Sequence, residues 1–275
     1  MIELNNTITE ILIKEQGIDI SKYDTTFLNN SIQKRIAEKQ CNTPEEYYAL
    51  IEQSNKEAKR FIDSLQISYT EFFRNPLTFS VLERIVLPSL FLNSKADKKK
   101  ETRIWSAASA SGQEAYSLAI LIEEIKNANC SNCKFRIFAT DQSEEQLLEA
   151  SIGKYKASAL NNMNIQRLKQ WFIKEGKTYT IKPELKENID FSVFDLLNKQ
   201  YSSPPVSIFG DFGIVLCANL LFYYKPEFQK QIMKKITHSL AEDGYLITGE
   251  AEREIVMNHN YHEVYPQSAI FQKNR

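Results

Sequence analysis

The sequence predicts an α/β protein in which a mostly parallel sheet is wound by crossover helices and preceded by an all-helical segment. Residues 1–68 contain helical apolar patterns and no strand-like run. From residue 103 onward, short β-branched and aromatic runs alternate with helical patterns, which is typical of a parallel sheet with crossover helices. Because 275 residues exceed a usual single core, we expect two domains, at 1–68 and 69–275.

The N-terminal segment reads as successive helices. Apolar residues recur at helical spacing over residues 4–12, 28–36 and 58–65, and Gly17 is a plausible stop after the first stripe. Thr43 before Pro44 is an N-cap signal, and Ser54 followed by Glu57 repeats the capping pattern. Each stripe predicts a helix with one buried face.

The rest of the chain supplies the alternating elements. Asn75-Pro76 opens a helix, and residues 93–103 are charged and predict an exposed loop. The expected strands are 103–109, 135–141, 177–181, 188–194, 213–219 and 244–250, with a closing hairpin formed by 262–266 and 269–273. The expected helices are 112–125, 144–151, 163–175 and 226–240.

Composition excludes several functional classes. The net charge of −1 gives no argument for nucleic acid or for an anionic membrane surface. No apolar run approaches the roughly 18 residues that span a bilayer, and the N-terminus lacks a signal-peptide order, so we expect a cytoplasmic protein. The Cys130–Cys133 pair lies far along the chain from His259 and His262, so no metal site is expected.

A ligand site is predicted where the first strand of the sheet meets its helix, in the stretch SAASASG that ends at Gly112. Small side chains there let a ligand approach the backbone, and a helix start offers free N–H groups. The three-glycine phosphate loop is missing, which favours a ligand without pyrophosphate. An ordinary strand-to-helix turn is the simpler alternative.

Two acids make the site more specific. Asp141 ends the second strand, where a carboxylate commonly accepts hydrogen bonds from ribose hydroxyls, although it could merely cap the next helix. Glu114 follows Gly112 by two residues and could pair with a cation. Together they indicate an adenosine that carries a positively charged amino acid.

Five motifs in order then resemble the CheR-type chemoreceptor glutamate O-methyltransferases: SYTEFFRN, RIWSAASASGQEAYSLAI, FATDQSEEQLLEASIGKY, FSVFDLLN and VLCANLLFYY. The resemblance covers roughly residues 68–275 and includes a preceding helical domain. It implies a Rossmann-like class I methyltransferase sheet with a small β-subdomain, and S-adenosylmethionine as cofactor, with S-adenosylhomocysteine as product.

The resemblance also implies roles for individual residues. Arg74 and Tyr223 match the residues expected beside the transferred methyl group, and no general base is required because a glutamate is already ionised at pH 7. The positions matching the family's cofactor contacts are Thr70, Arg74, Gly112, Glu114, Asp141, Asp195, Leu196 and Asn219. Ala218 departs from the family, which has an arginine at this position.

The implied partner is the helical cytoplasmic region of a chemoreceptor or a similar signalling protein. The matching docking helix offers Lys34, Arg35 and Lys39, although a solvated helix face explains these charges equally well. The glycine-bracketed insertion of pentapeptide-binding members is missing, so no pentapeptide tether is expected. Two alternatives stay open: a methyltransferase acting on a different acceptor, and a non-catalytic module that binds S-adenosylmethionine.

Overall fold

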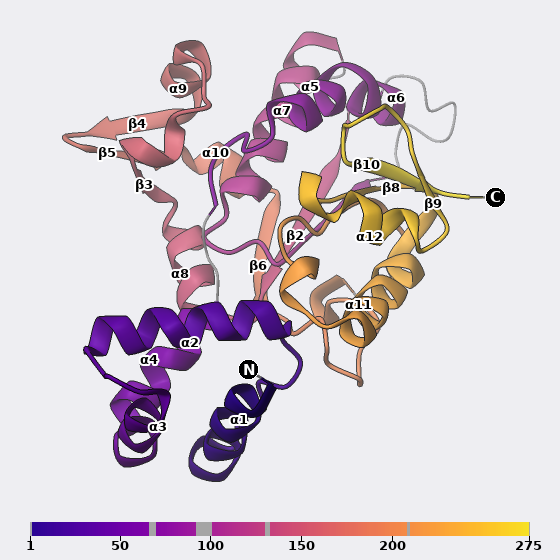
Figure 1. Ribbon diagram of the computed structural model, residues 1–275. Coiled ribbons are helices and arrows are strands. Elements are labelled where there is room, and N and C mark those ends of the chain that lie inside the picture. Colours follow the sequence, from indigo (N-terminus) through magenta and orange to yellow (C-terminus); the bar gives the residue numbers. More distant parts are fainter. Residues whose placement is uncertain (1, 66–69, 92–100, 130–132, 208–209, 275) are drawn as a thin grey trace. The chain divides into compact units, whose positions relative to one another are not determined.

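The computed structural model describes residues 2–65, 70–91, 101–129, 133–207 and 210–274 (Figure 1). The chain divides into two compact units. One comprises Met1–Ile67 and Phe222–Gln229, and the other comprises Ser68–Leu221 and Lys230–Arg275. Most of the predicted loop at 93–103, and Cys130, lie outside the described residues.

The helical unit contains α1 (Ile2–Gln16), α2 (Thr25–Lys39), α3 (Pro44–Gln53) and α4 (Asn55–Leu65). Its apolar stripes are buried as predicted, including Ile8, Leu12, Leu28, Ile32 and Phe61. The predicted cap of α3 is present, since the Thr43 hydroxyl accepts a hydrogen bond from the backbone N–H of Glu46 at 3.2 Å. The sequence patterns therefore place these helices correctly.

A segment distant in sequence completes the helical unit. The backbone N–H of Asp24 donates to the carbonyl of Tyr223 at 2.8 Å, and the N–H of Lys225 donates to Lys22 at 3.0 Å. Tyr23 and Tyr224 form an isolated antiparallel bridge, and their rings stack at 5.3 Å. Residues 222–229, which include part of η4 (Leu221–Tyr223) and the first turn of α11 (Pro226–Ser239), thus fold with α1–α4.

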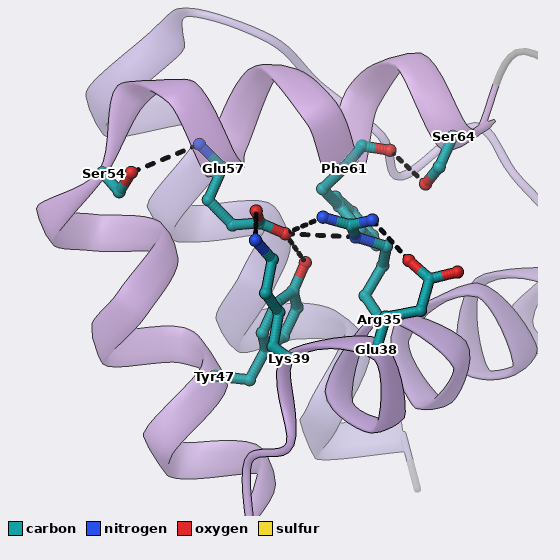
Figure 2. Close-up of polar contacts among 8 residues, drawn as sticks. All are labelled: Arg35, Glu38, Lys39, Tyr47, Ser54, Glu57, Phe61 and Ser64. Carbon is teal, nitrogen blue, oxygen red and sulfur yellow. Dashed lines mark hydrogen bonds and ion pairs between the residues drawn. The ribbon is translucent and has the colours of Figure 1, made fainter.

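A buried carboxylate joins three helices of this unit (Figure 2). Glu57 of α4 is 3% exposed, and its carboxylate accepts bonds from the guanidinium of Arg35, which also contacts Glu38. The ammonium of Lys39 lies 2.7 Å from the same carboxylate, and the hydroxyl of Tyr47 donates to it at 3.3 Å. Burial alone would raise the pKa of Glu57, but the bonds from Lys39 and Arg35 outweigh burial and hold the pKa below its usual value.

The other unit is built on a seven-stranded sheet in the order β6-β2-β1-β7-β8-β10-β9. Its strands are β1 (Thr102–Ala107), β2 (Phe135–Asp141), β6 (Ile189–Val193), β7 (Phe212–Leu216), β8 (Leu240–Ile247), β9 (Tyr261–Glu263) and β10 (Ile270–Lys273). The first five strands in this order run parallel, and β10 pairs antiparallel with both β8 and β9. The predicted parallel sheet with a closing hairpin is confirmed.

Helices connect the strands. They are α5 (Pro76–Val81), the π-helix η1 (Leu82–Val86), α6 (Leu87–Phe91), α7 (Gln113–Asn129), α8 (Glu144–Ile152), α9 (Ile165–Trp171), α10 (Pro183–Lys186) and α12 (Arg253–Met257), with the short 3₁₀ turns η2 (Ala157–Leu160), η3 (Pro205–Ser207) and η5 (Glu250–Glu252). Helix α7 carries a continuous run of fully buried residues that packs in the main core. In the part of the chain that the structure describes, no helix has the length and apolar character needed to cross a membrane.

The prediction of one helix over 163–175 is wrong in its second half. Helix α9 ends at Trp171, and β4 (Phe172–Glu175) pairs antiparallel with β5 (Thr178–Ile181) through a turn at Gly176, which has φ +62°. With β3 (Lys154–Lys156), β4 and β5 form a three-stranded antiparallel sheet. Its strands lie between α8 and β6 in the sequence. The buried ring of Phe172 packs on Phe72 at 5.3 Å, so tertiary contact overrides the local helical pattern.

Candidate functional site

The carboxyl ends of four neighbouring parallel strands form the candidate site. In register, Ala107 at the end of β1 lies opposite Thr140 of β2, and Asp141 lies opposite Val193 at the end of β6. Leu216, the last residue of β7, pairs with Ser106, which is one residue before the end of β1. The loops that follow these strands contain Gly112, Asp141, Asp195 and Asn219, so the fold brings these predicted residues to one edge of the sheet.

The β1–α7 loop has an unusual backbone. Ala108, Ala110 and Gly112 all have positive φ, at +82°, +44° and +89°. A Cβ atom on Gly112 would lie 2.9 Å from the Cβ of Ala150 in α8. Backbone conformation and the close approach of α8 therefore account for this glycine, and a direct contact with a ligand at Gly112 stays a prediction.

Asp141 joins this loop to the start of α8. One carboxylate oxygen accepts the backbone N–H of Ala110 at 2.9 Å, and the other accepts the N–H of Ser143 at 2.9 Å. Burial raises the pKa of Asp141, while these backbone donors act in the opposite direction. Ser143 itself caps α8 by accepting from Gln146. Both oxygens of Asp141 keep further acceptor capacity, which suits a pair of hydroxyl donors.

Glu114 lies in the first turn of α7 and has no hydrogen-bond donor among the described residues. The residue is half-buried, and the surrounding protein still removes part of the water around its carboxyl group. Burial, with a smaller contribution from the nearby carboxylate of Glu252, raises the pKa of Glu114 to about 8, and Arg74 opposes this shift. A half-buried acid whose charged form is disfavoured by desolvation is a site that a further cationic group can stabilise.

Two buried aromatic residues anchor the segment that carries Arg74. The ring of Phe72 packs on Tyr155 at 4.9 Å, and the backbone N–H of Phe73 donates to the hydroxyl of Ser117 at 3.1 Å. Phe73 has φ +52°, so the chain turns sharply before Arg74. Arg74 is exposed, and Thr70 is half-buried. The anchoring places the arginine near enough to Glu114 to affect its titration.

The remaining predicted residues follow β6 and β7. Asp195 is exposed, and one of its oxygens accepts the backbone N–H of Leu197 at 2.8 Å. Leu196 is buried, at 8% exposure. Asn219 has φ +59° in the loop after β7. Tyr223 belongs to the helical unit, where its ring lies 4.9 Å from that of Phe27.

The sequence analysis gave no role to Glu252. This residue is fully buried at the turn after β8, and its carboxylate accepts backbone hydrogen bonds from the loop that contains Asn219. Nothing in the local sequence GEAE at 249–252 indicates that its last acid points inward.

The strand order is that of a Rossmann-like methyltransferase sheet, with Asp141 at the end of β2 and Glu114 in the first turn of α7. The family model described as "CheR methyltransferase, SAM binding domain" matches residues 68–270, and "CheR methyltransferase, all-alpha domain" matches residues 6–65. The chain belongs to the CheR methyltransferase family.

Relatives with known names agree with this assignment. The chain is 31% identical over 245 residues to the chemotaxis protein methyltransferase of Listeria innocua, covering 89% of this chain and 88% of the relative. It is 34% identical over 195 residues to chemotaxis protein methyltransferase 1 of Pseudomonas aeruginosa, covering 70% and 68% of the two chains. The Escherichia coli chemotaxis protein methyltransferase is 27% identical over 252 residues, covering 89% and 82%.

The residues present fit the cofactor of this family. The Glu114 carboxylate lacks a donor and would take the ammonium group of S-adenosylmethionine. The Ser109 hydroxyl, in the loop after β1, is buried without a hydrogen-bond partner among the described residues. Asp141 offers oxygens for ribose hydroxyls at the end of the neighbouring strand. The Glu114 carboxylate and the Ser109 hydroxyl lack hydrogen-bond partners among the described residues, and a polar ligand bound at this loop would supply them.

Proposed function

We propose that this enzyme transfers a methyl group from S-adenosylmethionine to glutamate side-chain carboxylates of a chemoreceptor-like protein, forming methyl esters. The observation that carries the proposal is the proximity of the exposed Arg74 to the half-buried Glu114, whose titration it affects. The acid suits the cationic cofactor, and the arginine suits an incoming carboxylate. The name that these relatives carry, chemotaxis protein methyltransferase, supports the acceptor class.

The chemistry asks little of acid–base groups. S-Adenosylmethionine supplies a methyl group on a sulfonium, which is electrophilic without further activation. The acceptor glutamate is ionised at neutral pH, with an ordinary pKa of about 4.3. We propose that the chain's contribution is to orient the carboxylate in line with the methyl group and to exclude water, with Arg74 holding one carboxylate oxygen.

A base-labile methyl assay tests this function. Purified enzyme, labelled S-adenosylmethionine and helical receptor fragments should give methyl groups that alkali releases as methanol, and mass spectrometry should locate them on glutamates. Fragments with these glutamates changed to alanine are the matched control. Labelling only of other proteins, or tight cofactor binding without any transfer, would each contradict the proposal.

Arg74→Ala should lower turnover about tenfold or more at saturating cofactor, while the affinity for S-adenosylhomocysteine stays within about threefold. Arg74→Lys should fall between the two, because lysine keeps the charge but loses the fork of donors. Arg84→Ala, at an exposed arginine of η1, is the control. Turnover of Arg74→Ala equal to the wild type would remove Arg74 from the proposed mechanism.

Binding of S-adenosylhomocysteine should depend on pH through Glu114. The pKa of about 8 means that the unliganded site holds a proton below that pH, and an ammonium ligand must displace it. Affinity should therefore rise by up to about tenfold per pH unit from pH 6 towards 8, and fall above roughly pH 8 as the ligand's own amino group deprotonates.

Calorimetry in two buffers of different ionisation enthalpy measures this directly. At pH 6.5 the wild type should release close to one proton on binding, and Glu114→Gln should release none. Equal proton release by both proteins would show that another group titrates.

For docking, we propose the helical unit as the receptor-facing part, with α2 contributing chiefly Lys34. Of the three docking cations that the resemblance implies, we retain only Lys34. Arg35 and Lys39 are bound to the buried Glu57, whereas Lys34 is exposed. Either cation would have to break its ion pair with the buried Glu57 before it could bind a partner, and breaking a buried ion pair costs free energy.

A further inference from the structure

Glu252 is a buried anion that backbone groups satisfy. It is 0% exposed, and its carboxylate accepts four backbone hydrogen bonds: from Gly249 at 2.7 Å, Asn219 at 2.8 Å, Leu220 at 2.6 Å and Leu221 at 2.6 Å. Burial raises the pKa of this acid, and all four N–H donors oppose that shift by favouring the charged form. Such short charge-assisted bonds are what allow a carboxylate to be buried without a cation.

These bonds join two loops at the same edge of the sheet. Gly249 lies in the turn after β8, and Asn219, Leu220 and Leu221 form the loop after β7. The carboxylate therefore holds three consecutive N–H groups of the β7 loop in one direction. This arrangement needs an acceptor with two equivalent oxygens, which an amide side chain does not provide.

The four backbone hydrogen bonds that Glu252 accepts, called the clamp below, hold Asn219 in a left-handed conformation. Its φ of +59° lies in the left-handed region, which is uncommon outside glycine although asparagine adopts it more readily than most residues. A Cβ atom on Gly249 would lie 2.9 Å from the side-chain oxygen of Asn219, so the absence of a side chain there leaves room for that amide. Gly249 has φ −73°, so its own backbone does not require glycine. A Cβ there would also lie 3.0 Å from the Asn219 backbone nitrogen and 3.0 Å from a Glu252 carboxylate oxygen, so the close packing of both residues is the reason for a glycine at this position.

We propose that Glu252 is a positioning residue that acts through Asn219: it holds the β7 loop in the left-handed conformation that presents the Asn219 amide to the methyl-donor site. The inference rests on the proposed function in one respect, the assignment of Asn219 to the cofactor site. Glu252 need not touch substrate or cofactor, because its oxygens are taken up by the four backbone donors.

Two single variants test the clamp by different routes. Glu252→Gln replaces one acceptor oxygen with an NH₂ group, which must face backbone donors. Gly249→Ala keeps the charge of Glu252 but adds a Cβ that crowds the Asn219 amide, the Asn219 backbone nitrogen and one oxygen of Glu252. Each should weaken S-adenosylhomocysteine binding about five- to tenfold and lower turnover at saturating cofactor, with an unchanged far-UV circular dichroism spectrum. Glu250→Gln, at an exposed acid of the same turn, should match the wild type in all three measurements.

A double-variant cycle separates positioning from general support of the fold. In an Asn219→Ala background, the further loss of affinity caused by Glu252→Gln should shrink to less than twofold, because the residue through which Glu252 acts is gone. An undiminished loss in that background, or wild-type affinity and turnover in both folded single variants, overturns the inference. If Glu252→Gln does not fold, the affinity for S-adenosylhomocysteine is compared instead for Gly249→Ala with and without Asn219→Ala.

The ligand-binding readout keeps this test independent of the acceptor. If the wild type binds S-adenosylhomocysteine but esterifies no receptor fragment, the proposed acceptor is wrong and the Glu252 cycle can still be measured by binding.

Discussion

Replacing Glu114 or Asp141 with alanine is expected to weaken S-adenosylhomocysteine binding by about 1.5–3 kcal/mol, a loss of about 10- to 150-fold. For Glu114 the loss arises because the ligand's ammonium group would lose the carboxylate that balances its charge, while the cation of Arg74 remains nearby. For Asp141 it arises because its oxygens fix the Ala110 loop and are the acceptors for the ribose. Calorimetric titration measures both values.

The unliganded proteins provide the control. The pKa of Glu114 is raised in the folded state, so the wild type loses stability as pH rises from about 4.5 through about 8. Glu114→Gln should avoid this loss and melt at a higher temperature than the wild type at pH 8.5. Weak binding by a more stable protein cannot be attributed to unfolding. Glu123→Gln, on the same helix but paired with Lys126, should bind normally, and unchanged affinity in both alanine variants would refute the cofactor site.

Glu57→Gln is expected to lower the free energy of opening of the helical unit by about 3–5 kcal/mol, the usual effect of removing one partner from a buried ion pair. The variant leaves the cations of Arg35 and Lys39 facing a neutral amide in a buried position. Hydrogen exchange of the whole chain, resolved to peptides from α2, α3 and α4, reports this unit specifically. Tryptophan fluorescence would not, because both tryptophans, Trp105 and Trp171, belong to the other unit.

Glu38→Gln is the matched control because Glu38 contacts the same arginine from an exposed position, with 44% of its side chain accessible. Exposed pairs contribute about 0–1 kcal/mol, so exchange in α2–α4 should change little. A Glu57→Gln protein that exchanges as slowly as Glu38→Gln would show that the network does not stabilise the unit.

The sequence predicted elements well where one pattern was decisive. The strand at 135–141 coincides with β2, because a run of β-branched and aromatic residues ends in an acid. The sequence patterns predicted the wrong element where tertiary contacts determine the secondary structure, as at Phe172 and at the start of β8. There Leu240 pairs with Phe212 across a register shift, although the residues that follow Leu240 read as a polar loop. Local pattern carries no information about such pairing partners.

The same distinction applies to functional side chains. Glu114 and Asp141 could be predicted as site residues because Glu114 lies in the first turn of a recognisable helix and Asp141 ends a recognisable strand. Glu57 has the spacing of an N-terminal capping residue, and only the packing of α2 and α3 around it shows that it is a buried ionic centre. Glu252 is the parallel case, since the donors it serves are some thirty residues away in the chain.

The attachment of residues 222–229 to the helical unit has a practical consequence for dissecting the enzyme. A fragment cut between the two matched family regions, beginning near residue 68, would carry Tyr223 and Tyr224 away from Asp24, Tyr23 and Phe27. Two aromatic rings would be exposed to water, and the backbone partners of that stretch would be lost. Expression of the isolated C-terminal region should therefore be poor unless the N-terminal helices are supplied in trans.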